Sequence, residues 1–189
     1  ASVVIWTTTP WTIPGNRAIA YSSRIQYGMY EVIRAPDDNW AKPGDKLIIA
    51  DGLAENLKQA ARIDEWKRHD VSFGEGRDVQ VTACRHPFHK HGYDFEVRLY
   101  DADFVTEDTG TGFVHCAPGH GGEDYDLYVK HRTSFAKAGI PEVPHTVGED
   151  GYYFKHVPLF GGEHPKRVIN DKGKFDNANE AVIEELIKA

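Results

Sequence analysis

The strongest constraint on the fold is a stretch between residues 110 and 139, where three sequence patterns follow one another. Gly110 to Cys116 is an apolar run led by glycines, as in a strand, and Ala117 to Gly122 has the glycines of a flexible turn. The following residues favour a helix, with Glu123 and Asp124 in its first turn, an apolar face of Tyr125, Tyr128, Val129 and Phe135, and Gly139 at its end. We therefore expect a strand, a turn and a helix in succession.

The rest of the chain is rich in short strand patterns. Strands are predicted at residues 2–7, 27–33, 46–50, 79–84, 95–100 and 152–155. One further helix is predicted from Asp51, a plausible N-cap, through Leu53, Leu57, Ala60 and Ala61, and a last one from Asp176 or Asn177 with the stripe Val182, Ile183, Leu186 and Ile187. Pro10 and Pro14 exclude residues 10–16 from any helix or central strand. The expected class is mixed α and β, dominated by strands, with about three helices.

The sequence shows no internal repeat and no linker long enough to separate two domains, so we expect a single domain over residues 1–189. The chain opens inside an apolar run, Ala1 to Trp6, without Met. We therefore expect it to be a fragment of a larger protein.

Composition excludes several classes of protein. Hydrophobic residues make up 40% and charged residues 27%, which excludes a disordered chain. No run approaches the roughly 20 apolar residues of a membrane helix, and no signal peptide is recognisable, so no membrane partner is expected. The 22 Lys and Arg face 29 Asp and Glu, a net charge of −7, so any contact with nucleic acid must be local or supplied by a partner. Cys84 and Cys116 form no disulfide framework, and we expect a cytoplasmic protein.

Three consecutive hydroxyl residues, Thr7, Thr8 and Thr9, end the first apolar run and precede Pro10. In one interpretation they are a β-branched strand end whose hydroxyls satisfy local backbone groups. In the other, they form the polar wall of a pocket that positions a water molecule and a small substrate. The pattern alone leaves both open.

His115 ends the glycine-led strand, and Asp124 lies nine residues further on, at the predicted helix start. A strand, turn and helix can bring both side chains to one pocket mouth. A carboxylate near a helix N-terminus stays ionised and can bind an ammonium group. The alternative is that Asp124 caps the helix and His115 packs.

The segment Cys84 to His91 contains one Cys and three His, which suggests zinc. Its spacing matches no standard finger or ribbon, so we predict no metal site. The glycines form neither a P-loop nor a dinucleotide fingerprint, and they are expected to let backbone approach a ligand closely. No serine elbow and no paired cysteine nucleophile is present, so a hydrolase of this sequence would use water as its nucleophile.

Two segments resemble one known family. Trp6 to Asn16 resembles the threonine-rich motif that opens the editing domain of isoleucyl-tRNA synthetase, and Gly110 to Tyr125 resembles the second motif of that domain. The motifs occur in family order, His115 and Asp124 keep the family's spacing, and Val147 to Tyr152 fits the stretch that follows. Valyl and leucyl enzymes typically carry Arg where this sequence has Thr9, which favours the isoleucyl branch.

The resemblance implies an editing-domain fold with a barrel-like β core and about three peripheral helices. It implies hydrolysis of mischarged valyl-tRNA(Ile), with the aminoacylated 3′ end of tRNA(Ile) and the remainder of the synthetase chain as partners. The His-x-Gly-His and Lys-Met-Ser-Lys-Ser signatures of the ligase site are absent, so neither ATP use nor any cofactor is expected.

The resemblance also implies roles for single residues. Thr7, Thr8 and Thr9 would hold the substrate and the attacking water, and Asp124 would hold the α-ammonium group. His115 would help exclude isoleucine from the side-chain pocket, which the threonine wall and Trp11 would shape. Thr12 and Asn16 would bind the substrate. The terminal adenosine would lie against the glycine-rich strand at Gly112, and Gly119 and His120 would support the site.

Three other functions stay open at this point. One is a catalytically silent insertion that only binds the tRNA end, and another is the editing domain of a valyl or leucyl enzyme. The third is a metal-dependent hydrolase built on the Cys84 to His91 segment.

Overall fold

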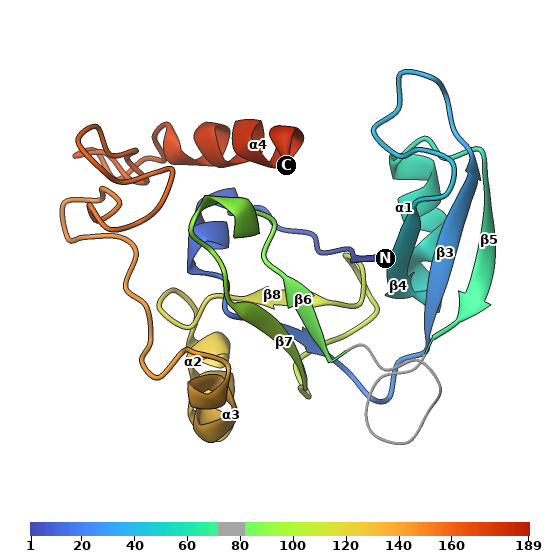
Figure 1. Cartoon of the computed structure of the whole chain (residues 1–189), viewed down its shortest axis with the longest axis horizontal. Coiled ribbons are helices and arrows are strands. Elements are labelled where there is room, and N and C mark those ends of the chain that lie inside the picture. The colour runs from blue at the N-terminus through green and yellow to red at the C-terminus, as the bar shows by residue number, and fades with distance from the viewer. Residues whose placement is uncertain (72–81) are drawn as a thin grey trace. The chain divides into compact units, whose positions relative to one another are not determined.

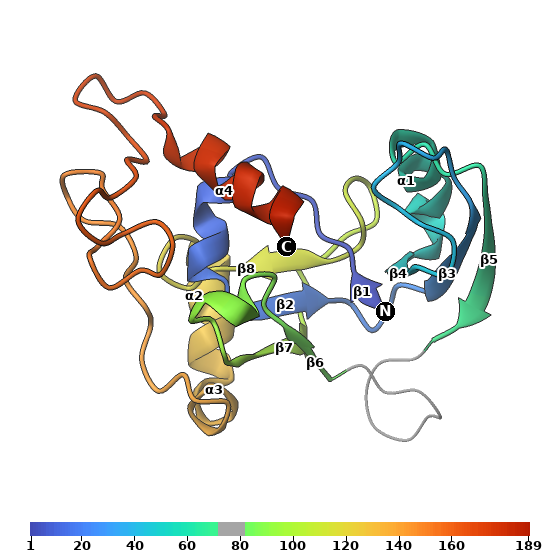
Figure 2. The same cartoon turned by 45° about the horizontal axis from the view of Figure 1, so that its top comes forward.

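The computed structural model describes residues 1–71 and 82–189 of the chain, which divide into two compact units (Figure 1 and Figure 2). The first unit comprises residues 1–6, 19–84 and 99–114, and the second comprises residues 7–18, 85–98 and 115–189. The expectation of one domain over residues 1–189 stays a prediction.

The first unit contains a four-stranded sheet of order β1-β4-β3-β5, formed by Ser2–Val3, Lys46–Ala50, Tyr27–Arg34 and Glu65–Asp70. β1 pairs parallel with β4, and β3 pairs antiparallel with β4 and β5. The short helix η2 (Asp51–Leu53) and α1 (Ala54–Ala60) follow β4, and α1 lies beside the sheet (Figure 1). Their shared core contains Tyr30, Val32, Leu47, Ile49, Ala54 and Ile63.

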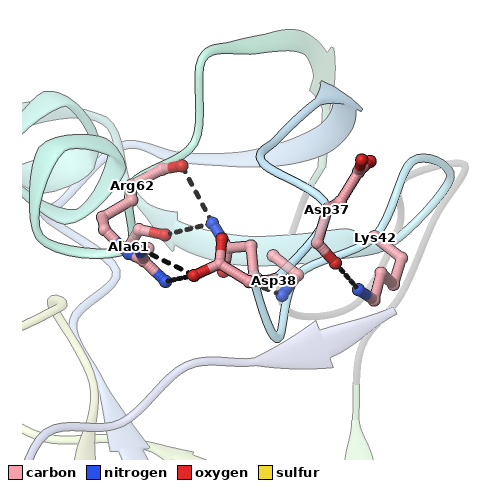
Figure 3. Close-up of polar contacts among 7 residues, drawn as sticks. Asp37, Asp38, Lys42, Ala61 and Arg62 are labelled. Atoms are coloured by element: carbon pink, nitrogen blue, oxygen red, sulfur yellow. Dashed lines mark hydrogen bonds and ion pairs between the residues drawn. The ribbon is translucent and has the colours of Figure 1, made fainter.

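A buried side-chain amide in the loop after β3 donates to the carbonyls of Ala61 and Arg62 at the end of α1, two residues that Figure 3 labels. Asn39 is 2% exposed, and its Nδ2 donates to the carbonyls of Ala61 at 2.7 Å and Arg62 at 2.8 Å. Its Oδ1 accepts from the Ala41 amide at 3.2 Å. These bonds satisfy carbonyls that the end of a helix leaves without intrahelical partners.

A second four-stranded sheet has the order β6-β7-β2-β8, formed by Ala83–Arg85, Glu96–Asp101, Ala18–Tyr21 and Val114–Cys116. The second unit contains two short helices, η1 (Pro10–Gly15) and η3 (His89–His91), and the helices α2 (Gly122–Lys130), α3 (Arg132–Lys137) and α4 (Ala178–Lys188). Large buried aromatic side chains fill its core: Phe88, Tyr93, Phe135, Tyr153 and Phe160.

The mixed α/β class is confirmed, and so are the predicted strands at 27–33, 46–50 and 95–100. The strands predicted at 2–7 and 110–116 are shorter than expected, because only Ser2–Val3 and Val114–Cys116 pair. The strand predicted at 152–155 is wrong, since Tyr152 and Tyr153 form isolated bridges. Residues 79–81 of the predicted stretch 79–84 lie outside the described residues, and β6 begins at Ala83.

Three predictions about helices are wrong. Residues 10–16 were expected to be non-helical, yet Pro10–Gly15 forms a 3-10 helix, because a proline at the first position gives up an amide that has no partner there anyway. Asp51 does not cap its helix; its carboxylate accepts from the Tyr30 hydroxyl and Arg68 instead. The helix expected after residue 122 is broken at His131 into α2 and α3, so the described residues hold four α-helices rather than three.

The barrel-like core is not confirmed. The described residues form two open sheets and no closed barrel. Within that same part of the chain, no helix is long and apolar enough to cross a membrane.

Candidate functional site

The three threonines lead directly into η1 in the second unit. The Thr9 amide donates to Thr7 Oγ1 at 3.0 Å, and the two hydroxyl oxygens lie 3.3 Å apart. Thr8 is exposed, and Thr7 and Thr9 are half-buried. Thr7 thus has the local backbone contact that a structural interpretation expects, while the Thr8 side chain faces solvent.

A hydrogen bond joins the two sequence motifs. Thr12 Oγ1 lies 2.7 Å from His115 Nε2, although the residues are 103 positions apart. The Thr12 hydroxyl donates its one hydrogen to the Thr9 carbonyl at 2.9 Å. The bond between Thr12 and His115 must therefore be donated by Nε2–H of the imidazole.

Burial determines the charge of His115. It lowers the pKa of His115 to about 4, and electrostatic repulsion from His120 in its protonated form acts in the same direction. The ring is therefore neutral near pH 7, with its proton on Nε2. His115 Nδ1 is buried and has no hydrogen-bond partner among the described residues.

Asp124 is held by the turn that precedes its helix. Its Oδ2 accepts from the Ala117 amide at 2.8 Å, and the N-cap of α2 is Gly121, without a side-chain cap. The interpretation of Asp124 as a helix cap therefore fails. Burial raises the pKa of Asp124, whereas hydrogen bonds from Ala117 and Cys116 lower it. The expected effect of the helix N-terminus on this carboxylate is thus outweighed by burial.

Trp11 and His120 bring the two motifs together a second time. Their rings meet edge to face at 4.8 Å, and His120 Nε2 lies 2.6 Å from Thr146 Oγ1. Tyr153 donates to the Trp11 carbonyl at 2.5 Å, and the Trp11 amide donates to Asn179 Oδ1 at 3.0 Å. Sequence reasoning missed these three supporting residues, although Thr146 lies next to the stretch that resembles the family.

A cavity of about 430 Å³ opens beside this pair. It is lined by Trp11, Gly119 and His120 together with parts of residues 145–151 and 167–171. The other predicted site residues do not line it. Asn16 is buried at the end of η1, and its Oδ1 has no partner in the described part of the chain.

Gly112 lies in the first unit, where it has a structural reason to be glycine. Its φ of 78° is in the left-handed region, and a Cβ there would come within 2.3 Å of the Ala50 Cβ. Its carbonyl accepts from the Tyr27 hydroxyl at 2.7 Å. Contact between Gly112 and an adenosine stays a prediction.

The described residues contain no group of three or more His, Cys, Asp or Glu side chains that could hold a metal ion. In the Cys84 to His91 segment, both ring nitrogens of His86 have protein partners, Ile13 O and the Phe88 amide. The absence of zinc stays a prediction that metal analysis can test.

Comparison with known proteins gives the family. No family model matches the chain. The isoleucine--tRNA ligase of Rhodopseudomonas palustris is 54% identical over 192 residues, covering 99% of this chain and 18% of that protein. The same ligase of Bradyrhizobium diazoefficiens is 50% identical, covering 100% and 19%. Over nearly its whole length, the chain is therefore similar to one segment of isoleucine--tRNA ligases.

The chain spans about a fifth of the length of the curated relatives it matches. A solved leucyl-tRNA synthetase structure, GlLeuRS-CP1, aligns with a TM-score of 0.50 at 20% identity, covering 75% of this chain and 50% of that one. The fold is thus shared with a synthetase CP1 domain. The expected resemblance to the isoleucyl branch is confirmed by the ligase relatives.

Proposed function

We propose that this chain is the editing site of an isoleucyl-tRNA synthetase and hydrolyses the ester bond of valyl-tRNA(Ile). The observation that carries the proposal is the hydrogen bond between Thr12 and His115, which brings the two motifs into contact inside one compact unit. The proposed partners are the aminoacylated 3′ end of tRNA(Ile) and the rest of the synthetase chain.

The chemical need for such a site follows from the size of a methylene group. A binding pocket distinguishes isoleucine from valine by about 1–3 kcal/mol, which is too little for accurate translation. A second pocket that admits valine and excludes isoleucine removes the mischarged product. His115 suits the wall of this pocket, because its neutral ring is fixed by Thr12.

In the proposed reaction, water attacks the carbonyl carbon of the ester. The bond from that carbon to the ribose oxygen breaks, and a proton from the water passes to the ribose oxygen, leaving valine and a tRNA with a free terminal hydroxyl. Thr7, Thr8 and Thr9 are the proposed ligands of the water and the substrate, and Trp11 and Asn16 are further contacts. Asp124 is proposed to bind the α-ammonium group, since burying that cation without a counter-charge is costly.

The direct test is deacylation of valyl-tRNA(Ile) by the full-length synthetase that contains this chain. Release of labelled valine at a rate above that of the free aminoacyl-tRNA is expected, with isoleucyl-tRNA(Ile) left intact. Equal rates with and without enzyme would instead favour a silent insertion that only binds the tRNA end.

A metal-dependent hydrolase is the remaining alternative. It requires stoichiometric metal in the purified protein and loss of activity on chelation. We expect deacylation to be unchanged by a chelator.

A further inference from the structure

His86 is a buried histidine that the proposed reaction does not use. It is 1% exposed and lies in the segment between β6 and η3. Its ring stacks on Tyr93, with centroids 4.5 Å apart and planes inclined by 10°. The Tyr93 hydroxyl donates to the Pro158 carbonyl at 2.9 Å, so the ring that supports His86 is itself fixed.

Both nitrogens of His86 have defined roles. The Phe88 amide donates to Nδ1 at 3.1 Å, which therefore carries no hydrogen. Nε2 holds the proton of the neutral ring and donates it to the Ile13 carbonyl at 2.9 Å. Burial lowers the pKa of His86 to about 4, which keeps the ring neutral near pH 7.

The Ile13 carbonyl, within η1, accepts two hydrogen bonds. One comes from His86, outside the helix, and the other from the Asn16 amide at 2.9 Å, at the end of the helix. Thr12 precedes this carbonyl in the chain and contacts His115, and Asn16 is the donor that closes the turn. The bond from His86 thus lies between two candidate site residues.

A second contact fixes the same turn. Arg17 Nη1 donates to the carbonyls of Pro14 at 3.0 Å and Asn16 at 2.7 Å, and the guanidinium lies 4.3 Å from the centre of the Phe95 ring. Phe95 also packs on His86, with centroids 5.6 Å apart. The aromatic segment that follows β6 therefore supports η1 both through His86 and through Arg17.

We propose that His86 is a positioning residue for the editing site, because its Nε2–H holds the Ile13 carbonyl and with it the orientation of Thr12 and Asn16. The inference rests on the proposed function. It gives the histidine-rich segment a role other than metal binding.

Two substitutions in the full-length synthetase distinguish the hydrogen bond that His86 donates to Ile13 from the one that it accepts from Phe88. In His86→Gln the side-chain amide nitrogen reaches about as far as Nε2 and can still donate to Ile13. In His86→Asn the side chain extends only to the position of Nδ1, so it can accept from Phe88 but cannot reach Ile13. Asn39→Ala is the matched control, because it removes another buried side chain with three hydrogen bonds, in the first unit.

Three measurements are made on each variant. Single-turnover deacylation of valyl-tRNA(Ile) at saturating enzyme gives the rate constant, and isoleucine ligation shows that the rest of the enzyme is intact. Hydrogen exchange of peptides over residues 10–17 reports the amide of Asn16. Thermal unfolding reports stability.

We expect His86→Asn to lower the deacylation rate constant about 10- to 100-fold, since small displacements of reacting groups have effects of that size. Exchange of the Asn16 amide should accelerate about tenfold as the turn loosens. His86→Gln should stay close to the wild-type enzyme in both measurements. Asn39→Ala should unfold at a lower temperature with unchanged deacylation and exchange.

Two results would overturn the inference. One is a folded His86→Asn enzyme with wild-type deacylation and exchange. The other is a loss of rate in both His86 variants and in Asn39→Ala that follows their loss of stability. If the wild-type enzyme itself fails to deacylate valyl-tRNA(Ile), the proposed function is wrong, and amide exchange alone decides whether His86 holds the turn.

Discussion

Asp124 is subject to two opposing influences. Burial favours its protonated form, whereas the hydrogen bond from the Ala117 amide favours the carboxylate. A bound ammonium group would add to the second influence and lower the pKa of Asp124 further. In the proposed function, binding of the substrate's ammonium group therefore stabilises the ionised form of Asp124, which is the form that binds this group.

Asp124→Ala should abolish most deacylation. Removing one partner of a desolvated charge pair costs about 2–5 kcal/mol, which is roughly 30- to several-thousand-fold in rate if the pair persists in the transition state. The measurement is single-turnover hydrolysis of valyl-tRNA(Ile) by the full-length enzyme.

The neighbouring acid is the control for this prediction. Glu123 is exposed and adjacent in α2, so Glu123→Ala should hydrolyse at the wild-type rate. An inactive Glu123→Ala enzyme beside an active Asp124→Ala enzyme would show that the other carboxylate binds the ammonium group.

His115→Ala should relax selectivity. The lost ring leaves space for one more methylene, so isoleucyl-tRNA(Ile) should be hydrolysed about 10- to 100-fold faster than by the wild-type enzyme. Release of isoleucine from correctly charged tRNA is the measurement. Unchanged hydrolysis of both substrates would return His115 to a packing role.

At the scale of elements, the N-terminus of α2 leaves little space for a side chain at Gly121. A Cβ at Gly121 would lie 2.7 Å from Asp124 Oδ2, although the backbone there is extended and unstrained. At Gly122, the next residue, a Cβ would meet nothing within 4 Å. These adjacent glycines therefore offer a test of the carboxylate's position without changing its chemistry.

Gly121→Ala should displace the Asp124 carboxylate and reduce deacylation of valyl-tRNA(Ile) about tenfold or more. Gly122→Ala should keep the wild-type rate and raise stability by about 0.4–1 kcal/mol, because alanine has less conformational freedom than glycine in the unfolded chain. Deacylation kinetics and thermal unfolding of the two variants make the comparison. Equal rates would show that the site tolerates movement of this carboxylate.

The sequence allowed prediction of those elements whose pattern is local. Strand-favouring residues identified β3, a turn followed by an apolar run identified β4, and apolar alternation identified β7. Helical spacing identified α1 and α4. β5 was missed, because an edge strand of charged residues, Glu65 to Asp70, shows no apolar alternation. η1 was missed because its prolines disfavour α-helix without excluding a 3-10 turn.

The candidate site could be predicted as two motifs but not as a geometry. Thr12 and His115 were both identified from sequence, yet their hydrogen bond depends on tertiary packing. His86 was noticed only as one of several histidines beside Cys84. Its bond to the Ile13 carbonyl leaves no signal in the sequence, because a main-chain acceptor is the same at every residue.

At the scale of the whole molecule, buried histidines make stability depend on pH. The pKa values of His86 and His115 are lowered to about 4 by burial, and that of His120 is lowered too. Below about pH 6.5 these histidines are protonated in the unfolded chain but stay neutral in the folded chain. A lower pH therefore favours unfolding. Asp124, whose pKa is raised by burial, acts in the opposite sense.

The free energy of unfolding of the second unit should therefore fall as the pH drops from 6.5 towards 4, by up to about 3 kcal/mol for each of His86 and His115. Denaturant unfolding at pH 7, 6 and 5 is the measurement. His86→Gln lacks one of the titrating groups, so its stability should depend less on pH. Stability that is constant between pH 7 and pH 5 would contradict the prediction.

The hydrogen bond from His86 to the Ile13 carbonyl has a consequence for how the sequence can vary. His86 binds a main-chain carbonyl, so we expect position 13 to accept other buried apolar side chains. At position 86, by contrast, a substitution must keep the hydrogen-bond donor. We therefore expect residues 7–16 and the aromatic segment after β6 to be inherited together. Grafting residues 7–16 into a distant editing domain would transfer the loop's chemistry only if its histidine support were transplanted with it.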